Sequence, residues 1–188
     1  SIRWIDRLIG LASTLILARL LAPNDIGVIA MATLAIGIVD VLLDFGVNIT
    51  LIQQRNATPE HFNSAWTLRI IQSTLATIIV YLAAGPAAEY FDEPRVVGVM
   101  HVLAGALILA GLENIGTVTF QKNMEFGMEF RFFMAKRLIG FLATMAAAWW
   151  LRNYWALVIG TLVGRFSGTC LSYLVHPMRP RICFAKTK

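Results

Sequence analysis

Six long apolar stretches follow one another along this chain of 188 residues, with short connections between them. They cover residues 8–21, 26–52, 62–88, 96–120, 138–151 and 154–175. A helix needs about 20 mostly apolar residues to cross the hydrocarbon core of a bilayer. Four stretches have that length, and the first and fifth reach it with their flanking residues, 4–22 and 130–151. The pattern predicts an all-α membrane protein with six transmembrane helices in an up-and-down bundle.

The composition supports this fold class. Hydrophobic residues make up 57% of the chain and charged residues 14%, whereas soluble domains have roughly 45–50% and about 25%. The length predicts one domain, residues 1–188, and the short connections leave no room for a soluble domain. The formal charge is +5, but the basic residues are dispersed. A nucleic-acid-binding protein gathers them on one face, so we expect no nucleic-acid partner.

The residue pattern gives no sign of enzymatic chemistry. His61, His101 and His176 are isolated near the ends of apolar stretches, and Cys170 and Cys183 lack the spacing of a zinc site. There is no Ser–His–Asp or Cys–His arrangement and no phosphate-binding loop. We therefore predict that the protein is not an enzyme and holds no metal ion or cofactor.

The distribution of Lys and Arg predicts the orientation, because cytoplasmic connections carry an excess of both. Three basic residues fall on one side of the predicted bundle: Arg19, Arg95 and Arg152. Eleven fall on the other side: Arg3, Arg7, Arg55, Lys122, Arg131, Lys136, Arg137, Arg179, Arg181, Lys186 and Lys188. Both termini are therefore predicted to be cytoplasmic.

Several ionisable residues fall inside the apolar stretches, where each needs a partner or a function. They are Arg19, Asp40, Asp44, Arg69, Glu113 and Arg165. Asp44 and Arg69 are predicted roughly 12 and 15 Å from the same membrane face in neighbouring helices, so an ion pair between them is expected. Glu113 is expected to pair in the same way with Lys136 or Arg137. Such pairs either hold the hairpins together or take part in function.

Arg165 is predicted near the middle of the membrane, eleven residues from both Tyr154 and His176. Small residues recur every fourth position around it, a spacing that lets another helix approach closely. It is either a structural arginine, neutralised by Asp40 or by backbone carbonyls, or a fixed cation in a water-filled pathway. Asp40 and Asp44 share a helix face; they either relay protons or bind a cation, or they neutralise Arg69 and Arg165.

A basic and aromatic segment, residues 124–137, precedes the fifth apolar stretch. Segments of this kind bind the anionic head groups of membrane lipids, although many are simply helices that enter the interface. Membrane lipids are therefore expected partners.

Several short motifs resemble one family of membrane transporters. Residues 17–27 read LARLLAPNDIG, which is similar to the first-loop signature of polysaccharide flippases. Residues 44–47 (DFGV) and 51–55 (LIQQR) resemble the exit of the second helix in that family, and 155–160 (WALVIG) and 179–181 (RPR) resemble its sixth helix and the following loop. The family is the oligosaccharide and lipopolysaccharide exporter branch of the multidrug/oligosaccharidyl-lipid/polysaccharide (MOP) flippase superfamily.

This resemblance implies a two-lobed transporter, with six helices in each lobe around a central cavity and an alternating-access cycle. Members move undecaprenyl-pyrophosphate-linked oligosaccharide across the bacterial inner membrane for lipopolysaccharide or exopolysaccharide biosynthesis. The chain resembles the first lobe only, and it begins with Ser1 inside a hydrophobic pattern. We therefore expect a fragment of a longer protein whose C-terminal lobe is a partner, and we expect polysaccharide polymerase and export machinery as further partners.

The resemblance also implies roles for the buried charges. Arg19, Arg69 and Arg165 are candidate cavity cations for the pyrophosphate. The candidates for ion or proton coupling are Asp40, Asp44 and Glu113. A polar lumen for the sugar is expected from Asn48, Thr50 and Asn114. The alternative is a non-transporting scaffold or assembly subunit of a polysaccharide export system, in which the buried charges could be replaced as neutral pairs.

Overall fold

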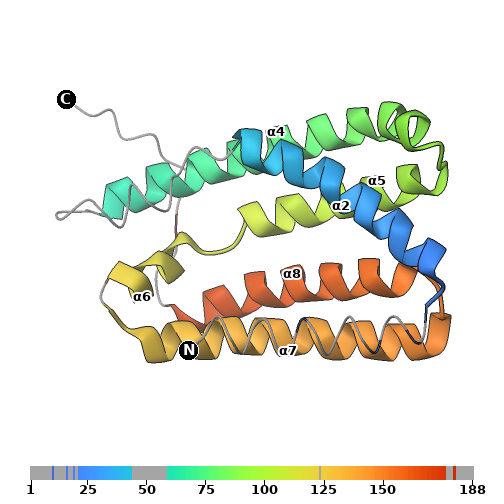
Figure 1. Cartoon of the computed structure of the whole chain (residues 1–188). Helices are drawn as coiled ribbons and strands as arrows, with labels where there is room; N and C mark the ends of the chain where they lie inside the picture. The colour runs from blue at the N-terminus through green and yellow to red at the C-terminus, as the bar shows by residue number, and fades with distance from the viewer. Residues whose placement is uncertain are drawn as a thin grey trace.

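The computed structural model describes residues 21–43, 59–122 and 124–176, together with residues 10, 16, 19 and 180. The described part of the chain is helical and contains no strand, which confirms the all-α class (Figure 1). Its elements are α2 (Pro23–Leu43), α4 (Pro59–Phe91), α5 (Arg95–Gly111), the 3-10 helix η1 (Ile115–Thr117), α6 (Val118–Lys122), α7 (Phe126–Leu151) and α8 (Trp155–Val175).

The long helices run up and down and pack side by side. Figure 1 shows α5 between α4 and α8, with α7 beyond α8 and with α2 crossing obliquely over α4 and α5. Four of these helices, α2, α4, α7 and α8, are long and apolar enough to cross a membrane. The predicted number of six crossings stays a prediction, because residues 1–9, 11–15 and 44–58 lie outside the described part.

The apolar stretch 96–120 was expected to form one continuous helix, and this expectation is wrong. Helix α5 ends at Gly111 after 17 residues, which span about 25 Å, and a non-helical segment separates it from η1. Asn114 has an extended backbone, and its side-chain oxygen accepts a hydrogen bond of 2.9 Å from the N–H of Gly116. Asparagine favours such capping bonds over a helix interior. Asn114 therefore caps a new helical segment, which begins at the next residue.

Helix α4 continues past Pro86 to Phe91, although the proline lacks an N–H for the helix. Gly85 and Pro86 stand together there, and kinks in helices commonly fall at such residues. Figure 1 shows α4 changing direction near this end.

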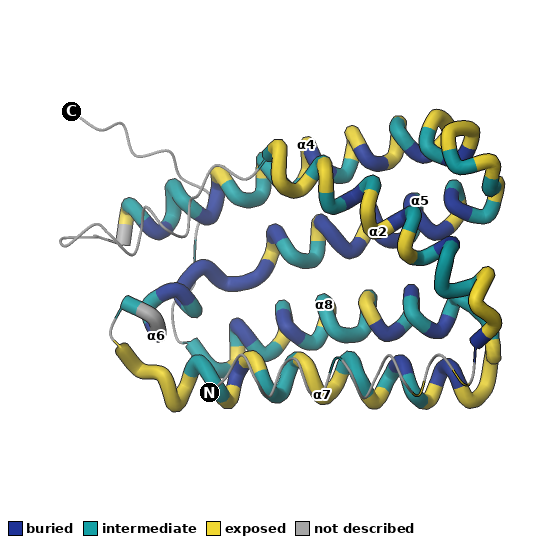
Figure 2. Tube along the Cα trace, in the orientation of Figure 1, coloured by how far each residue is buried: buried dark blue, intermediate teal, exposed yellow. Residues whose placement is uncertain are grey.

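The main hydrophobic core lies where α2, α4 and α5 meet, and it includes Val28 and Ala32 of α2, Val80 of α4, and Met100 of α5. Figure 2 shows buried residues concentrated along α5 and exposed residues on the outward faces of α4 and α7. Many exposed side chains are large and apolar: Leu34, Val41, Leu82, Leu142 and Trp150 are among them. Such an apolar outer surface suits a lipid environment rather than water.

Small residues bring α7 and α8 close together, as the spacing in the sequence predicts. A Cβ atom added to Gly160 would overlap the hydroxyl of Thr144, and one added to Gly168 would overlap the side chain of Lys136. Gly140 and Gly164 also meet, since a Cβ on Gly164 would lie 3.5 Å from the Cα of Gly140. The helices therefore pack through backbone contacts, as transmembrane helices with small residues do.

We expect Gly160→Ala to destabilise the protein by about 2 kcal/mol, because overpacking a close helix contact forces the backbones apart. The added Cβ would lie 3.0 Å from the Cα of Thr144, a backbone atom that cannot rotate away. Thermal unfolding in detergent measures the change. Gly164→Ala is the matched control, since its Cβ makes ordinary contact, and an equal loss in both variants would contradict this packing.

Arg95 contacts residues of three segments at one end of the bundle. Its guanidinium lies 3.4 Å from the carboxylate of Asp25 and 2.8 Å from that of Glu93. It also lies 5.9 Å from the ring centre of Tyr154. The hydrogen bonds from Arg95 lower the pKa of the Glu93 carboxyl below its ordinary value. Arg95 thus joins the start of α2, the α4–α5 connection and the α7–α8 connection.

Candidate functional site

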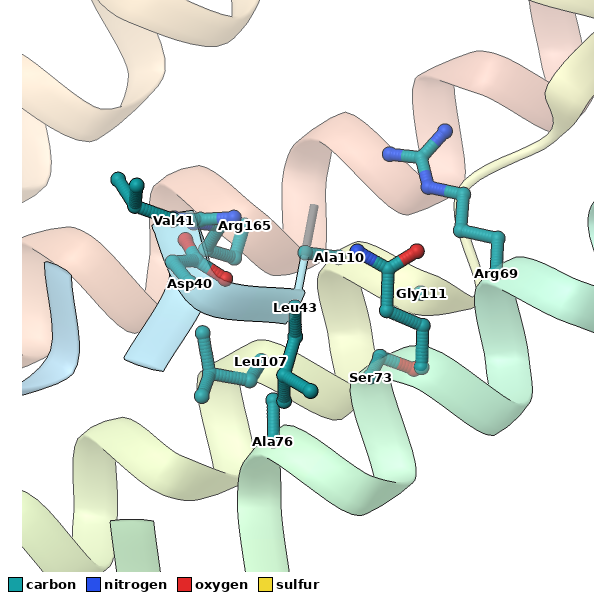
Figure 3. A pocket seen from close by; sticks show the side chains of 11 residues that line it. Asp40, Val41, Leu43, Arg69, Ser73, Ala76, Leu107, Ala110, Gly111 and Arg165 are labelled. Atoms are coloured by element: carbon teal, nitrogen blue, oxygen red, sulfur yellow. The ribbon is translucent and has the colours of Figure 1, made fainter. Parts of the chain in front are cut away.

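A cavity of about 370 Å³ lies between four helices (Figure 3). Its lining residues are Asp40, Val41 and Leu43 of α2, Arg69, Gln72, Ser73 and Ala76 of α4, Leu107, Ala110 and Gly111 of α5, and Arg165 of α8. Two cations, one carboxylate, one carboxamide and one hydroxyl therefore line this half-open cavity, whose α2 side is exposed at Asp40 and Val41.

Helix periodicity and a glycine shape this cavity. Arg69, Gln72, Ser73 and Ala76 are three or four residues apart, so they share one face of α4. Gly111 allows α5 to approach that face, since a Cβ added there would overlap the side chain of Ser73. The close contact between α4 and α5 at Gly111 thereby forms one wall of the cavity.

The charged groups that line the cavity form no ion pair with one another in the described part of the chain. Arg69 and Arg165 are partly buried, and Asp40 is exposed. Figure 3 shows Asp40 and Arg165 at one end of the cavity and Arg69 at the other. The lining holds two arginines and one carboxylate, and this excess of positive charge favours binding of an anion.

The structure thus brings together three of the six residues selected from the sequence. Arg19 is an exposed helical residue that does not line the cavity. Asp44 lies outside the described residues, so the Asp44–Arg69 pair stays a prediction. The predicted lumen residues Asn48 and Thr50 also lie outside the described part.

Glu113 forms the ion pair that the sequence predicts, with a distance of 2.7 Å between its carboxylate and the ammonium of Lys136. Both side chains are largely buried, with 10% of Glu113 and 23% of Lys136 exposed. Arg69 is close enough for the charge of Glu113 to act on it. Glu113 lies beside the cavity rather than in its lining, so its direct contact is with Lys136.

Asn114 was expected to contribute to a polar lumen, but it does not line the cavity. Its side chain is fully buried and is used to restart the helix after the break. An asparagine near the end of an apolar stretch can cap a helix or face a cavity, and here the capping bond determines its position.

Sequence reasoning missed Gln72, Ser73 and Gly111. The signal for the first two was present, because they lie three and four residues after Arg69 and so share its helix face. Gly111 had no such signal, since its role depends on the approach of α4 in space.

These observations define a helical membrane protein with a half-open cavity between its helices, in which arginines outnumber carboxylates. Residues 16–188 match the family of polysaccharide biosynthesis proteins, and the chain belongs to this family. The membership confirms the family resemblance inferred from the sequence.

Two curated relatives support this assignment. The lipopolysaccharide biosynthesis protein WzxC of Escherichia coli (strain K12) is 20% identical over 156 residues, covering 83% of this chain and 31% of the relative. An uncharacterized membrane protein in the cps region of Klebsiella pneumoniae is 21% identical over 155 residues, covering 82% and 32%. The chain therefore spans about a third of the length of these relatives. No solved structure matches it.

Proposed function

We propose that this chain forms one lobe of a flippase that moves lipid-linked oligosaccharide across the bacterial inner membrane, for lipopolysaccharide or exopolysaccharide biosynthesis. A second lobe from the same protein would complete the pathway. The observation that carries the proposal is the cavity between α2, α4, α5 and α8, in which Arg69 and Arg165 outnumber the single carboxylate of Asp40.

The chemistry of the cavity suits such a cargo. A pyrophosphate is a compact anion, and arginine binds phosphate oxygens through two parallel hydrogen bonds. Asp40, Gln72 and Ser73 offer hydrogen-bonding groups to sugar hydroxyls, while the lipid tail remains in the bilayer. In this proposal Asp40, Asp44 and Glu113 are the candidates for coupling to ions or protons, and Arg19 is a further candidate cation outside the cavity.

The proposed orientation places both termini in the cytoplasm, with the Leu43, Glu60 and Val175 ends of the helices on the cytoplasmic side. We expect a single cysteine at Glu60 to react with an impermeant thiol reagent only from the cytoplasm. A cysteine at Tyr90, at the other end of α4, should react only from the periplasm. Both side chains are exposed. The reverse labelling pattern would overturn the orientation.

Deletion of the gene in the bacterium that carries it tests the proposal. We expect surface polysaccharide to disappear while lipid-linked oligosaccharide accumulates in the inner membrane. The accumulated units should be protected from periodate added to intact spheroplasts, because they remain in the cytoplasmic leaflet. Oxidation of the units in spheroplasts would show that flipping continues without this protein, and a scaffold role would then replace the proposed one.

A further inference from the structure

The break after α5 leaves backbone groups without their helical partners inside the bundle. In a membrane such groups need partners from the protein, since the hydrocarbon supplies none. The partners come from α8. The hydroxyl of Thr169 donates to the carbonyl of Leu109 at 2.7 Å, and the hydroxyl of Tyr173 donates to the carbonyl of Leu112 at 3.0 Å.

In a third hydrogen bond the backbone of the break is the donor and a hydroxyl of α8 is the acceptor. The N–H of Asn114 donates to the hydroxyl of Ser172 at 2.9 Å, and both residues are fully buried. Thr169, Ser172 and Tyr173 are three and four residues apart, so they share one face of α8. We call these three residues the hydroxyl clasp, because together they hold the break in the fourth apolar stretch against α8.

The hydroxyl clasp reaches the cavity through Thr169. The hydroxyl of Thr169 lies 3.1 Å from the carbonyl of Arg165, one turn earlier on α8, as well as 2.7 Å from Leu109. Leu109 directly precedes Ala110 and Gly111, which line the same cavity as Arg165. The single hydroxyl hydrogen of Thr169 is shared between these two carbonyls, so this side chain links α8, one turn after Arg165, to the end of α5.

We propose that Thr169 and Tyr173 are positioning residues for the anion site: the hydroxyl clasp holds the α8 backbone at Arg165 against the end of α5 and thereby keeps its guanidinium in the cavity. This proposal rests on the proposed function, in which Arg165 contacts an anionic cargo. The clasp residues themselves need not touch the cargo.

The test measures the charge that a probe meets inside the cavity. Gln72→Cys places one thiol in the lining of the full-length gene product, in which Cys170, Cys183 and any other native cysteines are replaced by serine. The thiol is labelled in membranes with thiosulfonate reagents of equal size, one anionic and one cationic. Because the thiolate fraction affects both rates equally, the ratio of the rates reports the electrostatic potential at residue 72.

We expect the anionic reagent to react faster in the otherwise unchanged protein, and Arg165→Gln to reduce this preference. Thr169→Val combined with Tyr173→Phe should reduce the ratio by about threefold, since the guanidinium no longer has a fixed position. Thr169→Ser keeps a hydroxyl at this position. This variant should therefore keep the rate ratio of the unchanged protein, whereas Thr169→Val should lower it. Thr161→Val is the matched control, because among the described residues the hydroxyl of Thr161 bonds only within its own helix, to Leu157 at 2.9 Å.

The outcomes separate the two proposals. If the unchanged protein shows no anionic preference, the proposed anion site fails. If Arg165→Gln removes the preference but the clasp variants keep it, the positioning role is wrong while the anion site stands. If the double variant does not fold, Thr169→Val alone decides, and an unchanged ratio there overturns the positioning role.

Discussion

Arg165→Ala is expected to reduce polysaccharide export by about 100-fold while protein abundance stays near normal. A paired, charge-assisted contact with phosphate contributes about 3 kcal/mol, and its loss corresponds to about a 100-fold decrease in affinity. Arg165→Lys should retain part of the activity, because the charge survives but the planar fork that suits phosphate is lost. Export is measured as surface polymer in a strain that carries only the variant gene.

Asp40→Asn tests whether Arg165 has only a structural role, because Asp40 lines the cavity together with Arg165. If Arg165→Ala prevents folding, and adding Asp40→Asn restores both folding and export, then Arg165 is a structural partner of Asp40. That result would remove Arg165 from the cargo site.

The second large effect is expected at the buried ion pair. Glu113→Gln should destabilise the protein by about 3–5 kcal/mol, because it leaves the ammonium of Lys136 buried without its partner. Lys136→Met should cost less, since the charge of Arg69 also acts on Glu113 and remains in that variant. The double variant should recover most of the loss, as replaced buried pairs commonly do. Unfolding of all four proteins in detergent gives the coupling free energy.

Equal losses for the two single variants would contradict the part assigned to Arg69. Additive losses in the double variant would show that the pair contributes no coupling, despite the distance of 2.7 Å between its charged groups.

Much of the fold follows from patterns along the chain. Helices α7 and α8 end where the apolar stretches end, and the turn between them at Arg152 follows the predicted boundary. The glycines of α8 face α7 as their four-residue spacing predicts. These features were accessible because they depend on length, hydropathy and helical periodicity, which are local properties of a sequence.

The break after Gly111 was not predicted, because residues 96–120 are apolar enough for one crossing. Its stability depends on Thr169, Ser172 and Tyr173, which are about sixty residues away in the chain and meet the break only in the folded protein. Polar residues of this kind stabilise an irregular backbone inside a bundle, and their spacing alone does not reveal which backbone they will bond.

In the candidate site, too, some features follow from local sequence patterns and others depend on how the helices pack. Arg69, Arg165 and Asp40 could be selected because charges inside apolar stretches are costly. That these three line one cavity, whereas Arg19 does not, depends on how α2 and α8 are arranged around α4 and α5. Depth along a helix can be counted from the sequence, but the rotation of each helix about its axis cannot.

Binding of undecaprenyl pyrophosphate to the purified full-length gene product tests the proposed cargo site most directly. We expect saturable binding that weakens by clearly more than about 100-fold when Arg69 and Arg165 are both replaced by glutamine, because the loss of one such contact alone corresponds to about 100-fold. Uncharged undecaprenol should not compete, because the cavity arginines recognise the anion and the tail stays in the lipid. Equal affinity of the unchanged protein and the double variant, or equal competition by undecaprenol, would contradict a pyrophosphate site at these arginines.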